Sequence, residues 1–297
     1  MRPGPEALAA AEPVLRAGTS PDAGVALTGD KSLMFLDASD AFVVFGISGG
    51  SWIAYGGPVG PAQAAEDVAF DFVEEARRAG THPVFYEVGA EDVPVMLDLG
   101  MQLHKMGKDA VVDLSRFSLE GSSRKKLRAA HARAGRDGLT LEILSPPHDP
   151  ALIERLREIS DAWLVAKHAR EKGFSVGRFD PAWLGRWPLA VVLRESEPVA
   201  FANVMTAGDG RAASIGLMRH ADDAPSGTMK YLFTELMLQL KACGCLRFSL
   251  GMAPLSGLAP ERSSRLSDRF GAAIYRHGGG FYNFEGLRAF KQKFDPV

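Results

Sequence analysis

The spacing of apolar residues in the first 115 positions predicts alternating strands and helices. Two runs of β-branched and aromatic residues, 41–47 and 51–55, flank a Gly-Gly pair, which is typical of a β-hairpin. Between residues 62 and 79, apolar side chains recur every three or four positions, which indicates an amphipathic helix. The complete series expected here is helix 6–17, strand 41–47, strand 51–55, helix 62–79, strand 83–88, helix 93–100 and strand 110–114.

The second half of the chain repeats this order of elements. The expected series is helix 150–167, strands 189–194, 199–206 and 212–217, helix 228–242, strand 246–250, helix 267–277 and a mixed segment to Phe294. Because the two series echo each other, the sequence predicts an α/β protein with a duplicated unit. A strand meander followed by helix, strand, helix and strand is the order of the GNAT acyltransferase fold. We therefore expect a tandem GNAT-like fold, with lobes at 1–121 and 139–297 and a basic linker helix at 122–138.

Residues 122–136, SSRKKLRAAHARAGR, contain six Lys or Arg residues and no acidic residue. The serines are expected to cap a helix and Gly138 to end it. Leu127, Ala130 and Ala134 would rest on the protein, which leaves the cations in water: Arg124, Lys125, Lys126, Arg128, Arg133 and Arg136. A solvated linker helix is the alternative, although such helices usually mix charges of both signs.

Charge is divided unevenly along the chain. Residues 1–115 hold 7 Lys or Arg against 17 Asp or Glu, and the remainder holds 27 against 19. This asymmetry favours a polyanionic partner for the basic part. No apolar run is long enough to cross a bilayer, the N-terminus lacks a signal-peptide core, and two cysteines are too few for a zinc site, so we expect a cytosolic protein without a metal.

Several motifs resemble one known family. The closing stretch FYNFEGLRAFKQKFDP, residues 281–296, resembles the C-terminal motif of the phosphatidylglycerol lysyltransferases, or multiple peptide resistance factors. Six other segments agree with it: GDKSLMF (29–35), FSLEG (117–121), ISDAWL (159–164), EKGFSVG (171–177), GTMKYLF (227–233) and LGMAPLSGL (250–258). The similarity runs from about residue 25 to the end, and it implies the soluble catalytic domain of this family and a tandem GNAT fold.

The resemblance also implies a reaction. An amino acid, lysine by default and alanine as a variant, would pass from aminoacyl-tRNA to the headgroup hydroxyl of phosphatidylglycerol, with no cofactor. Such an enzyme changes the charge of the membrane and contributes to antibiotic resistance in bacteria. The expected partners are aminoacyl-tRNA, phosphatidylglycerol, the membrane surface and a transmembrane portion of the parent protein, and the expected location is the cytoplasmic face of the inner membrane. The basic helix would bind the tRNA.

Two cations are the candidate catalytic residues. Arg219 ends the LMR sequence after a predicted strand, where a guanidinium can grip phosphate in a bidentate manner. Lys291 matches the functional lysine of the family. Lys291 and Lys293 alternate with Phe290 and Phe294, as on a strand with cations on one face. The remaining residues assigned to binding of lipid or the tRNA end are Tyr282, Asn283, Glu285, Arg288 and Lys293.

Departures from the family pattern keep other functions open. Gly216 and Gly57 stand where the family typically has aspartate. Their presence leaves room for a weakened or non-catalytic domain that only binds lipid or tRNA. A GNAT enzyme with another donor is a further alternative, but residues 219–228 lack the RxxGxG spacing that acetyl-CoA enzymes use for the pyrophosphate. The histidines have no recognisable Ser or Cys partner for a hydrolase triad.

Overall fold

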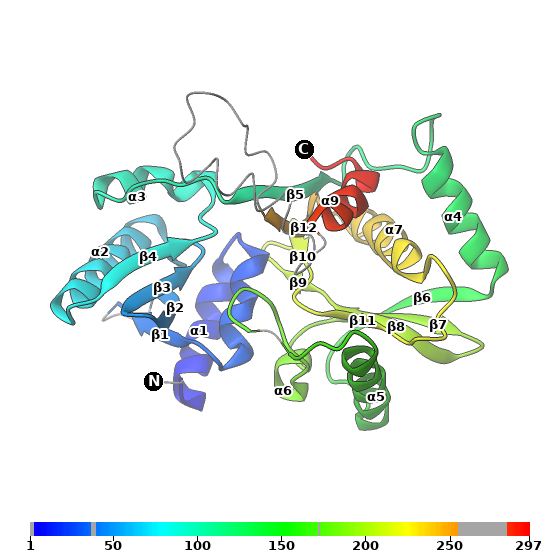
Figure 1. Ribbon diagram of the computed structural model, residues 1–297, viewed down its shortest axis with the longest axis horizontal. Helices are drawn as coiled ribbons and strands as arrows, with labels where there is room; N and C mark the ends of the chain where they lie inside the picture. Colours follow the sequence, from blue (N-terminus) through cyan, green and yellow to red (C-terminus); the bar gives the residue numbers. More distant parts are fainter. Residues whose placement is uncertain (1–2, 37–39, 172, 255–283) are drawn as a thin grey trace.

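The computed structural model describes residues 3–36, 40–171, 173–254 and 284–297. Two lobes lie side by side in Figure 1, the first in blue and cyan and the second mostly in green and yellow. In the described part of the chain, the strands form three sheets of four strands each. One sheet belongs to each lobe, and the third joins the lobes.

The first lobe is a four-stranded sheet with α2 packed on one face. Its elements are α1 (Pro5–Ala17), η1 (Pro21–Thr28), β1 (Ser32–Phe35), β2 (Phe42–Ser48), β3 (Ser51–Tyr55), α2 (Ala62–Arg78), β4 (His82–Tyr86), η2 (Ala90–Asp92) and α3 (Val93–Asp98). Gly49 and Gly50 both have positive φ, which fits the two-residue turn of the β2–β3 hairpin. Val68 and Phe72 of α2 are fully buried against Phe45 of β2. After α2 the chain returns as β4, parallel to β3.

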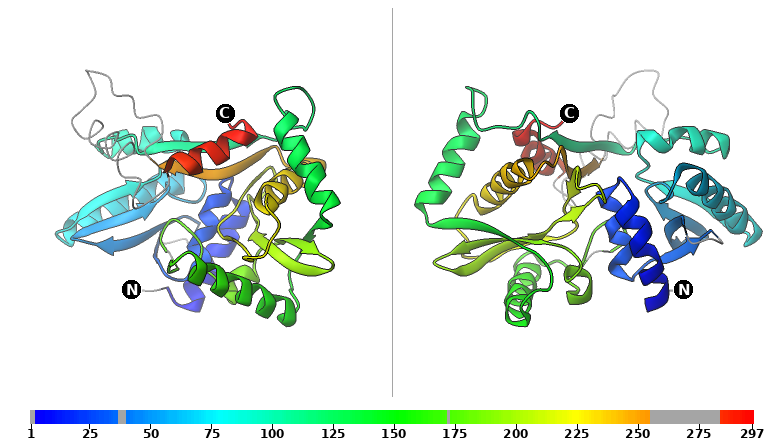
Figure 2. Two further views of the ribbon diagram at one scale, coloured as in Figure 1. Left: turned by 45° about the vertical axis from the view of Figure 1, so that its right-hand side comes forward. Right: turned by 180° about the vertical axis from the view of Figure 1, so that it is seen from behind.

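The second lobe has a similar order of strands and helices, with more elements. Its elements are α4 (Lys125–Arg136), β6 (Leu139–Leu144), α5 (Pro150–Ala166), α6 (Pro181–Leu184), β7 (Leu189–Arg194), β8 (Glu197–Asn203), β9 (Met205–Thr206), β10 (Ala212–Ser214), β11 (Met218–His220), α7 (Thr228–Ala242), β12 (Arg247–Pro254), α9 (Phe284–Lys291) and η3 (Gln292–Phe294). The antiparallel sheet β11-β8-β7-β6 lies between α4 and α7 on one side and α5 and α6 on the other (Figure 2).

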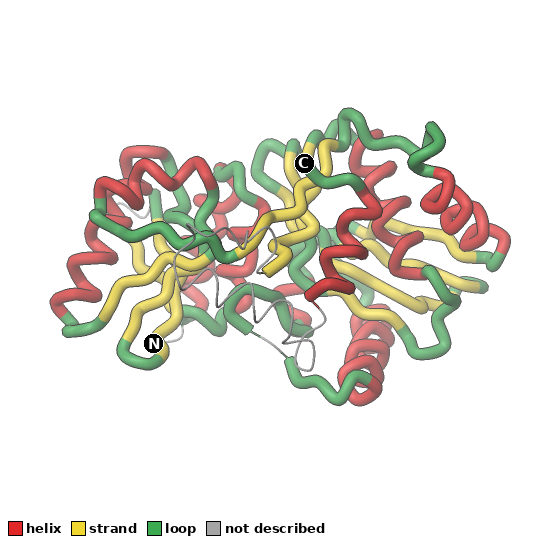
Figure 3. The backbone as a smooth tube through the Cα atoms, turned by 45° about the horizontal axis from the view of Figure 1, so that its top comes forward, coloured by secondary structure: helices red, strands yellow, loops and turns green. Residues whose placement is uncertain are grey.

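A third sheet, in the order β5-β12-β10-β9, connects the lobes. Its first strand, β5 (Gly107–Asp113), follows the first lobe in sequence and pairs antiparallel with β12 of the second. Strand β12 runs parallel to β10, and α7 makes the crossover between them. Ladder hydrogen bonds therefore hold the first lobe to the second, and the view in Figure 3 shows β5 passing from one lobe to the other.

The α/β class and the tandem, GNAT-like order of elements are confirmed. Each lobe contains an antiparallel meander, a helix and then a strand parallel to the end of the meander. Three strands, β1, β6 and β11, were not predicted, and each lies at the edge of its sheet. The strand predicted at 199–206 is divided into β8 and β9, and that at 212–217 is shortened to β10. The predicted helix 267–277 lies outside the described residues.

Two local predictions were wrong. The C-terminal alternation of lysine and phenylalanine forms helix α9 and the short turn η3, not a strand. Phe290 and Phe294 are four residues apart and both pack on Phe233, so helical spacing governs this segment. At the basic helix, Arg124 occupies the N-cap without a side-chain cap, so the serines do not cap it. None of the helices in the described ranges has the length and apolar character needed to span a bilayer.

Candidate active site

Polar side chains from both lobes meet where the connecting sheet joins them. They come from η1, the ends of β3 and β4, β5, β10, β12 and α9: Asp22, Tyr55, Glu87, Asp109, Ser214, Ser249 and Lys291. Ser249 Oγ lies 3.3 Å from Asp109 Oδ1 and accepts a hydrogen bond from the Gly251 N–H at 3.0 Å. We call this group the junction site.

Lys291, the last residue of α9, is the buried cation of the junction site. Only 7% of the residue is exposed. Its Nζ donates hydrogen bonds to the carbonyl oxygens of Gly251 at 2.8 Å and Met252 at 2.9 Å. The register of β12 against β5 shifts between Ser249 and Met252, and Gly251 has a φ of 77° there. A glycine is needed because this bulge turns two neighbouring carbonyls toward one side chain.

Three groups of the junction site have perturbed pKa values. Loss of water on burial lowers the pKa of Lys291 to about 8, although Asp109, Glu87 and Asp22 favour its charged form. Burial raises the pKa of Glu87 to about 7, and the charges of Asp22 and Asp109 add to the rise. Burial also raises the pKa of Asp22 to about 6, although a hydrogen bond with the hydroxyl of Ser214 acts in the opposite direction and lowers this pKa. Groups that titrate near neutral pH within reach of one another can take up and release protons.

Tight packing of η1 places Asp22 in the junction. A Cβ atom on Gly24 would lie 2.8 Å from the ring of Trp187 and 2.9 Å from Met205 Sδ, so only glycine fits there. The indole Nε1 of Trp183 donates to the Gly24 carbonyl at 3.1 Å. Side chains of the second lobe thus pack closely on η1, the segment that follows α1. This packing holds Asp22, in the first turn of η1, against the third sheet.

An aromatic wall stands beside the carboxyl groups. The ring of Phe174 lies 6.1 Å from that of Tyr55 and 6.0 Å from that of Tyr86, which end β3 and β4. Burial raises the pKa of Tyr55, and the charges of Asp22 and Glu87 act in the same direction. Phe174 comes from the second lobe and has a φ of 66°, a conformation that costs energy for a residue with a side chain. Residues of both lobes thus form this wall next to the carboxyl groups of the junction site.

Arg219 lies in a different network. Its Nη2 is 3.1 Å from Glu171 Oε2, its Nη1 donates to the Met218 carbonyl at 2.8 Å, and its guanidinium stands 4.4 Å from the ring centre of Trp163. The side chain is 11% exposed. Burial lowers the pKa of Arg219, but a guanidinium stays protonated throughout the physiological range. The contacts of Arg219 are with α5 and the loop after it, whereas those of Lys291 are with β12.

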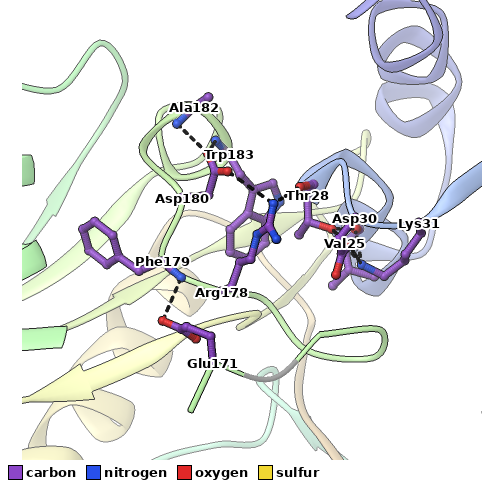
Figure 4. Close-up of polar contacts among 10 residues, drawn as sticks. All are labelled: Val25, Thr28, Asp30, Lys31, Glu171, Arg178, Phe179, Asp180, Ala182 and Trp183. Atoms are coloured by element: carbon purple, nitrogen blue, oxygen red, sulfur yellow. Dashed lines mark hydrogen bonds and ion pairs between the residues drawn. The ribbon is translucent and has the colours of Figure 1, made fainter. Parts of the chain in front are cut away.

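Glu171, which bonds to Arg219, lies beside Phe179, and the neighbouring Arg178 reaches Thr28 of the first lobe (Figure 4). Glu171 Oε1 accepts a hydrogen bond from the Phe179 N–H at 3.2 Å, and Arg178 Nη2 donates to the Thr28 carbonyl at 3.4 Å. In the GDK motif, Lys31 Nζ donates to Thr28 Oγ1 at 2.7 Å and to Asp30 Oδ1 at 2.5 Å. Arg219 thus holds a loop that carries Phe174 to the junction site and contacts the end of η1.

The cations of the basic helix differ in their exposure and in their contacts. Arg124 was expected in water, but its side chain is only 16% exposed, stacks on Phe117 and bonds to Asp295 at 3.2 Å. Arg128 donates to the carbonyls of Leu119 at 2.5 Å and Gly121 at 3.1 Å. Arg133 lies 3.5 Å from Asp137. The exposed cations of this helix that keep the predicted orientation are Lys125, Lys126, Arg128, Arg133 and Arg136.

Other predicted residues are outside the junction site or outside the described structure. Arg288 and Lys293 are exposed, and Lys293 Nζ lies 5.2 Å from the ring centre of Phe290. Tyr282 and Asn283 lie outside the described residues, and so does the side chain of Glu285. Of the residues predicted in this segment, the structure brings Lys291 to the carboxyl groups. In the described ranges, no group of three or more His, Cys, Asp or Glu residues is placed to hold a metal ion.

The two glycines that stand where the resemblance implied aspartate, Gly216 and Gly57, are closely packed by other side chains. A Cβ atom on Gly216 would lie 2.7 Å from the ring of Trp183, which is 1% exposed, so the indole already fills this space. The Gly216 N–H donates to Asn203 Oδ1 at 3.1 Å. At Gly57, a Cβ atom would collide with the carboxyl group of Asp92. Burial raises the pKa of this Asp92 carboxyl group to about 6. Neighbouring side chains thus occupy both positions.

Sequence reasoning missed Asp22, Glu87 and Asp109. A partial signal exists for Glu87, because it follows β4 directly and ligands of α/β sheets bind at the carboxyl ends of parallel strands. Asp109 directly precedes the predicted strand 110–114, and the structure places it within β5. Asp22 lies between a helix and a glycine-containing segment, and its residues alone resemble a solvated turn.

Comparisons with known proteins identify the relatives of this chain. Residues 12–297 match the family described as "Phosphatidylglycerol lysyltransferase, C-terminal". A phosphatidylglycerol lysyltransferase of Bacillus subtilis strain 168 is 39% identical over 269 residues, which is 90% of this chain and 31% of that protein. The corresponding protein of Staphylococcus aureus strain MRSA252 is 30% identical over 270 residues, or 91% of this chain and 32% of that one. The chain therefore spans about a third of the length of these relatives.

Solved structures agree. A C-terminal domain from Agrobacterium fabrum superposes with a TM-score of 0.88 at 39% identity, covering 98% of this chain and 88% of that one. The structure named L-PGS from Bacillus licheniformis gives 0.84 at 33% identity, covering 100% and 90%. FemX, at 11% identity and a TM-score of 0.55 over 95% and 91% of the two chains, shares the fold alone. The chain belongs to the family of the phosphatidylglycerol lysyltransferase C-terminal domain, whose named members are transferases.

Proposed function

We propose that this chain transfers lysine from aminoacyl-tRNA to the headgroup hydroxyl of phosphatidylglycerol. The hydroxyl oxygen attacks the aminoacyl ester carbonyl, a tetrahedral intermediate forms, and the terminal ribose hydroxyl of the tRNA leaves. One ester replaces another, so the reaction needs no energy source. The observation that carries the proposal is the junction site, where Lys291 is buried among carboxyl groups with perturbed pKa values.

Lys291 is the proposed proton carrier. With a pKa of about 8, about one tenth of the amine is neutral at pH 7, far more than for a lysine in water. The neutral amine accepts the proton of the lipid hydroxyl during attack and then delivers it to the departing ribose oxygen. Its bonds to the Gly251 and Met252 carbonyls fix the position of Nζ. General base catalysis of this kind contributes about 10²–10⁴ to the rate.

The chemistry of the junction favours lysine over alanine as the transferred amino acid. A lysyl side chain has an aliphatic stem that can lie on the aromatic wall of Tyr55, Tyr86 and Phe174 and an ammonium group that the carboxylates attract. An alanyl group could interact with the carboxylates only through its α-ammonium group. Glu87 adjoins Tyr86 in sequence, so the end of the wall and a carboxyl group are neighbours.

The basic helix supports tRNA as the donor. Lys125 and Lys126 are exposed on α4, in a stretch without acidic side chains, and a polyanion would replace its counterions there. The first lobe, with its excess of acidic residues, would repel the same polyanion. The charge of the molecule thus orients the donor toward the second lobe.

The direct test is a reconstituted transfer assay. The protein is incubated with phosphatidylglycerol, tRNA, a matching synthetase and labelled lysine or alanine, and the lipids are separated by chromatography. We expect label in the lipid with lysine, at least tenfold more than with alanine. Transfer must disappear with Lys291→Ala and persist with Lys167→Ala, a change at an exposed lysine at the end of α5. Label with neither amino acid would contradict the proposal and leave a binding domain or another donor as the function.

A further inference from the structure

Exposed apolar side chains follow one another along the chain from the end of α3 to the start of β5. Leu97 at the end of α3 is 57% exposed, and Leu103 and Met106 in the following segment are 45% and 46% exposed. His104, Lys105 and Lys108 are exposed among them. We call these six residues the α3–β5 patch: Leu97, Leu103, His104, Lys105, Met106 and Lys108. Large apolar side chains that stay in water next to cations are typical of surfaces that meet a partner.

The charge of the patch is opposite to that of its lobe. Residues 1–115 carry 17 acidic and 7 basic side chains, whereas residues 99–108, between the exposed Asp98 and Asp109, contain two lysines and a histidine and no acid. Apolar groups interleaved with cations are the composition of surfaces that lie in the headgroup layer of a bilayer. There, the apolar groups enter the acyl boundary and the cations meet lipid phosphates.

The patch leads directly into the junction site. Lys108 pairs with Ala253 of β12, and the next residue, Asp109, pairs with Met252, whose carbonyl accepts a hydrogen bond from Lys291. In Figure 1, α3, the following segment and β5 run along one edge of the molecule, the edge that also carries α9. A surface attached to this edge would therefore lie close to the junction site.

We propose that the α3–β5 patch docks on the surface of an anionic phospholipid bilayer. This inference rests on the proposed function, because it supplies the face by which the domain meets the lipid that it modifies. Leu103 and Met106 insert at the level of the headgroups, and Lys105 and Lys108 lie over lipid phosphates. The arrangement brings the headgroup to the end of β5, next to Asp109 and Lys291.

Vesicle binding tests the patch without any transfer reaction. The protein is sedimented with vesicles of phosphatidylcholine alone or with phosphatidylglycerol added. We expect binding to the mixed vesicles that L103S/M106S weakens at least about tenfold, since two exposed apolar side chains are lost. Lys105→Gln should weaken binding less and reduce its salt dependence. Val165→Ser is the matched control: Val165 is 75% exposed on α5, on the opposite edge in Figure 1, and its loss should change nothing.

Several outcomes would overturn the patch as a docking surface. Equal binding of L103S/M106S and the unaltered protein, with thermal unfolding unchanged, would place the membrane contact elsewhere. A dimer that is lost in L103S/M106S would assign the patch to a second copy of the chain. A separate assay, transfer by the unaltered protein to a short-chain, water-soluble phosphatidylglycerol, tests the proposed function. Transfer without vesicle binding would refute the patch alone, and vesicle binding without transfer would refute the function alone.

Discussion

Lys291 and Arg219 are both cations that lose most of their water when the chain folds, but their surroundings differ. Lys291 is held by two backbone carbonyls and faces carboxyl groups from η1, from β5 and from the residue after β4. Among the described residues, Arg219 has one carboxylate partner, Glu171, and it stacks on Trp163. Burial moves the pKa of Lys291 to about 8, whereas a guanidinium keeps its proton.

This difference indicates different roles. A group that exchanges protons near neutral pH is suited to move them in a reaction. A permanent cation that bonds to a loop and lies on an aromatic ring is suited to hold structure. We therefore infer that Lys291 acts on the reacting atoms and that Arg219 is a positioning residue, acting through the Glu171–Asp180 loop and its Phe174.

The largest effect is expected from Lys291→Arg. Arginine preserves the positive charge and the hydrogen bonds but cannot become neutral, so it cannot accept a proton. Transfer should fall by about 10²–10⁴-fold while tRNA and lipid binding stay near normal. Rapid-quench measurement of lysyl transfer, with binding measured in parallel, checks this expectation. A variant that keeps more than a third of the rate would show that charge alone suffices.

Changes at Arg219 should have a smaller effect of a different kind. Arg219→Lys and Glu171→Gln each weaken the hold on the loop, so the specificity for lysyl-tRNA, kcat/KM, should drop by about 10 to 100-fold. The double variant should lose little more than either single one, because both changes break the same contact. The pH dependence of kcat should keep its shape. Additive losses, or a shifted pH profile, would instead place Arg219 among the reacting groups.

The free energy of unfolding as a function of pH tests whether Asp22, a carboxyl group of the junction site, is buried as described. The pKa of Asp22 in the fold, about 6, is above its ordinary value of 3.8, so the folded protein binds the extra proton between these pH values. Ionisation of the Asp22 carboxyl therefore lowers the stability of the fold progressively as the pH rises from 3.8 to about 6. Above this window, the loss of stability stays constant. Asp22→Asn should raise the free energy of unfolding by on the order of 2 kcal/mol at pH 8 and by little at pH 4.

Denaturant titrations at both pH values test this prediction. Asp161→Asn, at an exposed position of α5, is the control and should change stability at neither pH. The same Asp22→Asn protein should transfer lysine more slowly, since the site loses a carboxylate that attracts the substrate ammonium. A stability loss at pH 8 would mean that Asp22 is stabilising and that its surroundings are not those described.

The smallest effect is expected from exposed cations. Lys125 and Lys126 stand in water on α4, and each would release one counterion from bound tRNA. In the double variant Lys125→Gln/Lys126→Gln, the logarithm of the tRNA-binding constant should fall less steeply with the logarithm of the salt concentration. The magnitude of this slope should drop by about 1 to 2, with no effect on lipid binding. Lys167→Gln is the control. An unchanged slope would remove the basic helix from tRNA recognition.

The sequence predicted the elements with strong local signals. The β2–β3 hairpin follows from its Gly-Gly turn, and α2 follows from the spacing of residues such as Val68 and Phe72. At the C-terminus, the two-residue alternation of Lys291 and Lys293 suggested a strand, but the four-residue spacing of Phe290 and Phe294 fits the helix that the core requires. Short strands such as β1, with four residues, carry too little pattern to stand out.

The junction site was only partly predictable, and the reason is physical. Lys291 was assigned by resemblance to a family motif, whereas Asp22, Glu87 and Asp109 become neighbours only because β5 pairs with β12 and η1 is clamped by Trp183. The raised pKa values of Asp22 and Glu87 arise from burial that no local pattern encodes. The close packing around Gly216 and Gly57 needed the structure as well, since Trp183 and Asp92 fill the space beside them.

The most direct test of the proton-carrying role is the single-turnover rate of lysyl transfer as a function of pH, corrected for spontaneous ester hydrolysis. If Lys291 must be neutral to act, the rate should rise about tenfold per pH unit below pH 8 and level off above it. The residual rate of Lys291→Arg should lack this limb. A rate for the unaltered protein that stays flat from pH 6 to 9 would contradict the account.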